Sequence, residues 1–156
     1  MEDLQDFLRA LGVGDVIVGV GNTLRGDDGF GPELVARISG KTRCRALDGG
    51  EMPEEQAVAI LESKPGRILF ADAVAFGGQP GELVLLRPDE LGKKVALSTH
   101  TLPLAMFIKQ LQQQLPCSAV MILGVQPRQI ALGKGLSPEV ARTVQLLAEL
   151  LVHNPI

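Results

Sequence analysis

Aromatic residues, cysteines and basic charge are all scarce in this sequence. Among its 156 residues there is no Trp and no Tyr, Phe occurs five times, and the formal net charge is −3. Nucleic-acid binding normally needs a basic face, and single-strand binding also needs aromatic rings on which bases stack. The composition therefore argues against nucleic acid as a partner.

Cysteine pairs, long apolar runs and targeting signals are missing as well. Cys44 and Cys117 are far apart and form no CxxC motif, so we expect two reduced thiols in the core and no disulfide framework. No apolar run reaches the ~18 residues that span a bilayer, and the N-terminal MEDLQDFLRALG is too acidic for a secretory signal. We therefore expect a cytoplasmic protein without membrane insertion.

The residues that are present have the composition of a globular domain. Hydrophobic residues make up 46% and charged residues 21% of the chain, which is typical of a folded domain with a substantial core. No repeat, low-complexity tract or linker divides the sequence. We predict a single domain over residues 1–156.

Apolar runs alternate with helical patterns along the chain. Strands are predicted at 15–20, 43–48, 67–76, 81–87 and 118–125, and helices at 32–38, 53–63, 102–115 and 137–151. The prolines that mark helix starts are Pro32, Pro53, Pro103 and Pro138, and Ser137 is the expected N-cap of the last helix. This alternation predicts a mostly parallel sheet with helices on both faces. The short turn GGQPG joins the third and fourth strands, so the fourth should run antiparallel to the third.

Carboxylates and one histidine follow the ends of the predicted strands. In sheets of this kind the ligand site lies beyond the carboxyl ends of the parallel strands, and the residues expected there are Asp27, Asp28, Asp48, Asp72 and His100. Structural interpretations stay open for each of them. Asp27 and Asp28 suit a turn or a helix start, and a buried Asp72 can pair with an arginine. His100 can be a capping or a core histidine.

The glycine-rich loop GVGNTLRGDDGFGP does not fit phosphate binding. Gly19 and Gly21 match the first two glycines of a dinucleotide-binding loop, but Leu24 occupies the third position. The segment GDDG also lacks the Gly-Lys-Ser/Thr of a P-loop, and its acidic residues would repel phosphate. There is no GxSxG motif for a serine nucleophile. What remains is a set of carboxylates and one imidazole, which can bind a borderline divalent ion.

Five motifs occur in the order GVGNTLRGDDGFGP, LDGGEMPE, ILFADAVAFGGQPGEL, STHTLPL and GVQP. Together they resemble the maturation endopeptidases of nickel–iron hydrogenases, and the resemblance extends over roughly residues 14–150. It implies a three-layer α/β/α sandwich with a five-stranded mixed sheet, in the strand order 2-1-3-5-4 with strand 4 antiparallel. It also implies an enzyme that removes the C-terminal tail of the hydrogenase large-subunit precursor after nickel insertion.

The resemblance implies roles for particular residues. The family's metal-binding positions fall on Asp28, Asp72 and His100, and a further acidic position of the family falls on Asp48. These four residues form the expected catalytic set, while Asp27 is expected to cap or orient the loop that carries Asp28. The expected metal is nickel supplied by the substrate, without a resident cofactor, and the expected partner is the large-subunit precursor.

Two questions stay open at the level of sequence. Either the nickel polarises the scissile carbonyl, or a carboxylate activates water as a general base, for which Asp48 is the candidate. The rival function is a nickel-handling or scaffold protein that binds the immature large subunit without cutting it. A nucleotide-binding domain is a third and weaker option.

Overall fold

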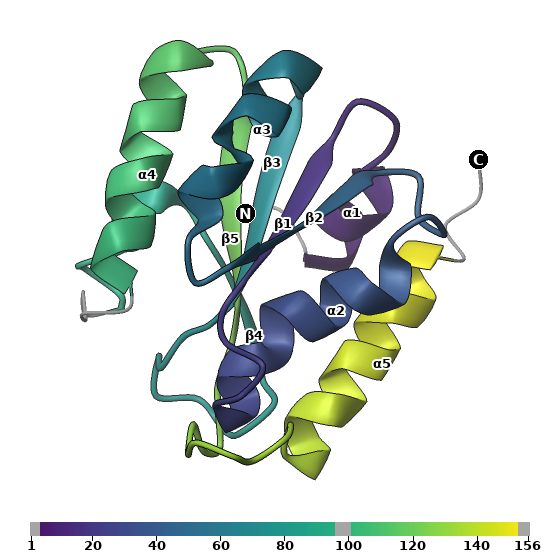
Figure 1. Cartoon of the computed structure of the whole chain (residues 1–156), viewed down its shortest axis with the longest axis vertical. Coiled ribbons are helices and arrows are strands. Elements are labelled where there is room, and N and C mark those ends of the chain that lie inside the picture. Colours follow the sequence, from purple (N-terminus) through teal and green to yellow (C-terminus); the bar gives the residue numbers. More distant parts are fainter. Residues whose placement is uncertain (1–3, 96–100, 153–156) are drawn as a thin grey trace.

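The computed structural model describes residues 4–95 and 101–152. Its strands are β1 (Val16–Val20), β2 (Arg45–Gly50), β3 (Arg67–Ala73), β4 (Leu83–Leu86) and β5 (Ala119–Val125). They form one sheet in the order β2-β1-β3-β5-β4 (Figure 1). All neighbouring pairs are parallel except β4 and β5, which are antiparallel. The expected strand order and the reversed direction of the fourth strand are therefore confirmed, with β5 as the partner of β4.

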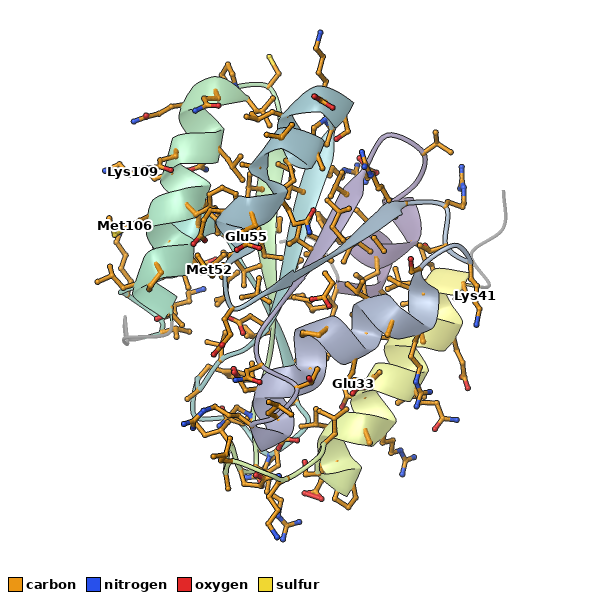
Figure 2. All side chains as sticks on the ribbon, in the orientation of Figure 1. Glu33, Lys41, Met52, Glu55, Met106 and Lys109 are labelled. Carbon is orange, nitrogen blue, oxygen red and sulfur yellow. The ribbon has the colours of Figure 1, made fainter. Side chains whose placement is uncertain are left out.

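Helices cover both faces of this sheet. One face carries α1 (Leu4–Ala10), α2 (Phe30–Ile38) and α5 (Pro138–Val152), and the other carries α3 (Ala57–Ser63) and α4 (Thr101–Gln114). Side chains fill the space between sheet and helices, and the labelled Met52 and Met106 lie on the side of α3 and α4 (Figure 2). Successive residues of β1 enter opposite cores, since Ile17 packs with α2 and α5 while Val16 and Val18 pack with α3 and α4. Burial on both faces explains why the strands are almost continuously apolar.

Short 3₁₀ turns account for several differences from the sequence-based boundaries. They are η1 (Gly26–Gly29), η2 (Pro53–Gln56) and η3 (Pro88–Glu90), so the helix expected at 53–63 begins as η2 and continues as α3. The strand expected at 67–76 ends at Ala73. Beyond it, the amides of Phe76 and Gly78 donate to Oε1 of Gln126 at 2.9 and 3.2 Å, which folds the chain into the turn before β4.

The helix-start signals read from the sequence are confirmed. The four prolines lie in the first turns of α2, η2, α4 and α5. The hydroxyl of Ser137 accepts a hydrogen bond from the amide of Val140 at 3.4 Å, as an N-cap does.

The two cysteines occupy different environments. Both are free thiols, as expected, and Cys44 is buried in the core. The expectation of a core position is wrong for Cys117, which is exposed in the turn between α4 and β5. Burial raises the pKa of the Cys44 thiol above its ordinary value, against an opposing hydrogen bond from Thr42.

This difference predicts selective labelling by a thiol reagent at neutral pH. Cys117 is expected to react at once, whereas Cys44 should react on the order of 100-fold more slowly, because its exposure requires a local opening of the fold. Mass spectrometry over time measures both rates, and Cys117→Ser should remove only the fast phase. Two fast-reacting thiols in the folded wild type would contradict the burial of Cys44.

Candidate active site

A cavity of about 220 Å³ opens at the carboxyl ends of β1 and β3. Strands, turns and a helix on this side of the sheet contribute its lining, which consists of Val20, Gly21, Asp28, Glu51, Pro53, Asp72, Pro103 and Leu104. The cavity therefore lies at the edge of the sheet where the alternation of strands and helices places a ligand site. Two of the expected site residues, Asp28 and Asp72, meet in it.

Glycines allow the loop that carries Asp28 to pack against the sheet. Gly21 has φ +141°, and a Cβ atom built there would overlap the backbone oxygen of Asp28. A Cβ atom at Gly31, at the start of α2, would overlap the backbone oxygen of Ala71 in β3. Only glycine permits these two approaches. These close approaches hold the η1 turn against β3. Asp28 therefore lies near Asp72, the residue that follows Ala71 in β3.

Asp72 is a buried carboxyl group in β3, with only 4% of its surface exposed. Burial raises the pKa of Asp72 well above its ordinary value, and the negative charge of Asp28 raises it further, against the backbone amide of Ala73. Within residues 4–95 and 101–152, no Arg or Lys forms a salt bridge with Asp72. The structural alternative for Asp72 was an ion pair with an arginine. The described part of the chain contains no such pair.

Asp28 is half-buried and belongs to η1. Its Oδ2 atom accepts a hydrogen bond from the amide of Asn22 at 3.0 Å, which ties the start of the loop to its end. The side chain of Asn22 in turn accepts from the amide of Leu24 at 2.8 Å. Two carboxylates thus face one small cavity, and a cation entering it would offset the repulsion between them.

Asp48 lies beside this cavity and does not line it. Its Oδ1 atom accepts a hydrogen bond from the amide of Gly50 at 2.9 Å, and the side chain is exposed. It borders a neighbouring hollow together with Asn22 and Pro32. Glu51 and Gly21 line both spaces, so the two hollows adjoin at these residues.

Glu51 is a carboxylate that the sequence reasoning did not single out. It follows the Asp48-Gly49-Gly50 segment at the carboxyl end of β2 and precedes η2. The signal that could have found it was its place three residues beyond the predicted strand 43–48, close behind Asp48. A glutamate in that place points toward the ligand side of a parallel sheet as readily as Asp48 does.

The third expected ligand, His100, lies outside the described residues, as does His153, the other histidine. His100 directly precedes Thr101, the first residue of α4, and two residues of that helix, Pro103 and Leu104, line the cavity. In the described part of the chain, no three or more His, Cys, Asp or Glu side chains are grouped as metal ligands would be. Of the three expected ligands, the described residues therefore supply the carboxylates of Asp28 and Asp72.

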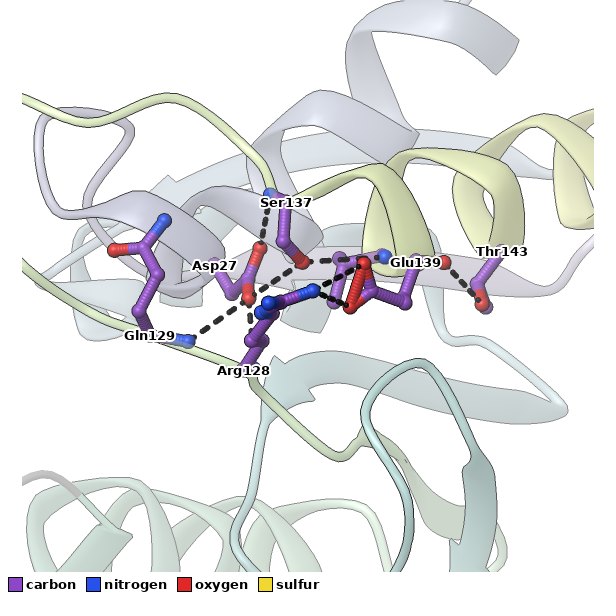
Figure 3. A network of polar contacts seen from close by, with 7 residues as sticks. Asp27, Arg128, Gln129, Ser137, Glu139 and Thr143 are labelled. Carbon is purple, nitrogen blue, oxygen red and sulfur yellow. Dashed lines mark hydrogen bonds and ion pairs between the residues drawn. The ribbon is translucent and has the colours of Figure 1, made fainter.

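Asp27 binds a second loop and does not face the cavity. Its buried carboxylate accepts hydrogen bonds from the amides of Arg128, Gln129 and Ser137 at 2.8, 3.2 and 2.7 Å, and from the Ser137 hydroxyl at 2.9 Å (Figure 3). The loop before α5 is thereby joined to the loop that carries Asp28. The expected orienting role of Asp27 has this physical basis, although its partners lie about a hundred residues away.

Comparison with known proteins identifies the family. The family model described as hydrogenase maturation protease matches residues 31–154. The chain belongs to the hydrogenase maturation protease family. The hydrogenase 3 maturation protease of Escherichia coli is 39% identical over 115 residues, which cover 72% of each chain. The resemblance to hydrogenase maturation endopeptidases that the sequence motifs indicated is therefore confirmed.

Solved structures of the family share the fold. The hydrogenase maturation protease HycI from Thermococcus kodakarensis matches with a TM-score of 0.83 and 34% identity over 97% of each chain. The maturating endopeptidase HybD from E. coli matches with a TM-score of 0.70 and 25% identity, covering 86% of this chain and 87% of that one. The protein is therefore a peptidase of hydrogenase maturation, and membership of this family does not favour the scaffold alternative. No helix in the described residues is long and apolar enough to cross a membrane.

Proposed function

We propose that the protein removes the C-terminal segment of a nickel–iron hydrogenase large-subunit precursor after nickel insertion. In this proposal the nickel arrives with the substrate, and Asp28, Asp72 and His100 bind it during cleavage. The enzyme has no resident metal of its own. Hydrolysis of the peptide bond follows only when the metal occupies the site.

The pairing of Asp28 with the buried Asp72 is the observation that carries this proposal. A carboxylate almost excluded from water is costly to ionise, and a second carboxylate in the same 220 Å³ cavity adds to the cost. A divalent cation reverses this balance, because it attracts both charges. Carboxylate oxygens, together with an imidazole from His100, form a donor set that suits nickel.

This arrangement supports selection for the loaded precursor. A nickel-free precursor would bring no cation between the two carboxyl groups, so their mutual repulsion would not be offset and binding would be weaker. The metal then acts as a specificity element that a mature or empty substrate lacks. The donor set of two carboxylates and one imidazole comes from three separate segments of the chain and contains no thiolate, which supports a metal borrowed from the substrate over a resident zinc.

Two routes to hydrolysis fit the cavity. The nickel of the substrate polarises the scissile carbonyl, or a carboxylate takes the proton of the attacking water. Asp48 remains the proposed base, and it would act from the adjoining hollow, which shares Gly21 and Glu51 with the cavity. Asp72 is suited to hold a proton before the metal arrives, because burial raises its pKa.

The test compares nickel-loaded and nickel-free precursor with the same enzyme preparation. The enzyme is first treated with a chelator, and the chelator is then removed. We expect full cleavage of the loaded precursor and none of the empty one, measured as loss of a C-terminal fragment by mass spectrometry. Activity that is lost after this treatment and returns only with added zinc would show a resident metal and contradict the proposal. A stable complex with unchanged precursor mass would favour the scaffold alternative.

A further inference from the structure

Two loops beyond the sheet edge expose large apolar side chains to solvent. Leu24, in the loop after β1, is 66% exposed, and Ile130 and Leu132, in the connection between β5 and α5, are 44% and 69% exposed. We call these three residues the apolar patch. Isolated surface leucines are ordinary, but a group of them on adjoining loops is characteristic of a protein-binding surface.

Backbone hydrogen bonds hold the two loops of the patch side by side. The amide of Gly133 donates to the carbonyl oxygen of Leu24 at 2.8 Å, which places Leu24 next to Leu132. The amides of Gly26 and Asp27 donate to the carbonyls of Lys134 and Gln129, each at 2.9 Å. The apolar side chains are therefore presented from a joined pair of loops.

The buried carboxylate of Asp27 adds hydrogen bonds to the connection between the two loops. It accepts hydrogen bonds from residues at both ends of the second loop, Arg128 and Ser137 (Figure 3). Ordering these loops before a partner arrives lowers the entropic cost of binding that partner.

The same loop connects the apolar patch to the catalytic cavity. Leu24 lies between Asn22 and Asp28 in the sequence. The backbone amide of Asn22 donates a hydrogen bond to the carboxylate of Asp28 at 3.0 Å. A partner seated on the patch is therefore held a few residues from the carboxylate that faces the cavity. Two exposed cations, Arg25 and Lys134, flank the patch and favour a partner with acidic groups around its apolar surface.

We infer that the apolar patch docks the folded body of the hydrogenase large-subunit precursor while its C-terminal segment enters the cavity. This inference rests on the proposed function, since it names the surface by which the same substrate is held. The precursor fits because it is the protein that must lie against this edge of the enzyme during cleavage. Its predicted contact surface is apolar at the centre and acidic at the rim.

The test uses the double variant Leu24→Ser/Leu132→Ser and the control Leu146→Ser, which changes a 57% exposed leucine on α5 outside the patch. Cleavage of purified nickel-loaded precursor is followed over a range of concentrations. We expect the KM of the double variant to rise at least about tenfold, equivalent to ~1.4 kcal/mol, with kcat at saturation and melting temperature unchanged. The control should match the wild type. Lys134→Glu should raise KM mainly at low salt.

An unchanged KM in the double variant would overturn the inference, and so would a fall in kcat without a change in KM. A wild type that is dimeric in solution and becomes monomeric in the double variant would also overturn it, because the patch would then bind a second copy of this chain. Failure of the proposed function gives a different result, since the wild type itself would then leave the precursor uncut.

Discussion

Replacing Asp72 with asparagine is expected to abolish cleavage and, at neutral pH, to raise the melting temperature of the protein. The activity should fall at least ~100-fold, because loss of even an outer partner of a metal typically costs 10–100-fold. Stability should rise because the native Asp72 must either take up a proton on folding or bury a charge beside Asp28, and an amide of the same shape does neither. Each kcal/mol gained corresponds to ~2–4 °C in a protein of this size.

The sign of the pH dependence follows from the direction of the pKa shift. The folded-state pKa of Asp72 lies above its ordinary value of 3.8, because burial and the charge of Asp28 favour the protonated form. Below that ordinary value the carboxyl group is protonated in both the folded and unfolded states, so it does not lower the free energy of unfolding. As the pH rises toward the folded-state pKa, the unfolded state loses its proton first and the folded protein loses stability. The asparagine variant avoids this loss.

Thermal unfolding of the two proteins from pH 3 to pH 8 measures the effect. The melting temperatures should converge at the acidic end and separate as the pH rises, with the variant higher. The matched control is Asp89→Asn, which changes an exposed carboxylate beside Arg87 and should alter neither activity nor this difference. An Asp72→Asn variant that melts below the wild type at neutral pH would mean that a cation pairs with this carboxylate in the folded enzyme.

The largest loss of stability is expected from Asp27→Asn. All the groups that bind this carboxylate are donors, namely the amides of Arg128, Gln129 and Ser137 and the Ser137 hydroxyl. An asparagine offers one oxygen and one NH₂ group, so at least one buried donor would face another donor. Unsatisfied buried donors and the lost charge-assisted bonds together cost about 3 kcal/mol or more, which is a fall of ~10 °C in melting temperature.

The neighbouring ion pair supplies the control for this prediction. Glu139 accepts hydrogen bonds from the guanidinium of Arg128 at 2.8 and 3.0 Å at the surface of the same network (Figure 3). Exposed pairs contribute ~0–1 kcal/mol, so Glu139→Gln should change the melting temperature by a few degrees at most. Calorimetry on the three proteins makes the comparison. Equal losses in the two variants would show that the Asp27 network is not the joint between the loops.

Asp27 also shows why an adjacent pair of aspartates has two different roles. In η1 the two side chains point in different directions, so Asp28 lines the cavity while Asp27 lies in the interior. From sequence, both suited a turn, and either could have been placed at the site. The resemblance to the family assigned the metal position to Asp28, and the structure places that residue in the cavity with Asp72.

The sequence by itself determined the elements and the edge of the sheet at which the site forms. Apolar periodicity, prolines at helix starts and a short turn before β4 are local properties, so they predicted the alternation and the antiparallel strand. The motifs that resemble the family predicted that Asp28 and Asp72 meet. Only the tertiary structure decided that Cys117 is exposed, and that Asp48 lies in a neighbouring hollow that shares Glu51 with the cavity. It also decided the partners of Asp27, which are 101 to 110 residues away along the chain. Contacts over such separations depend on how helices and loops pack against the sheet, and no local pattern of residues records them.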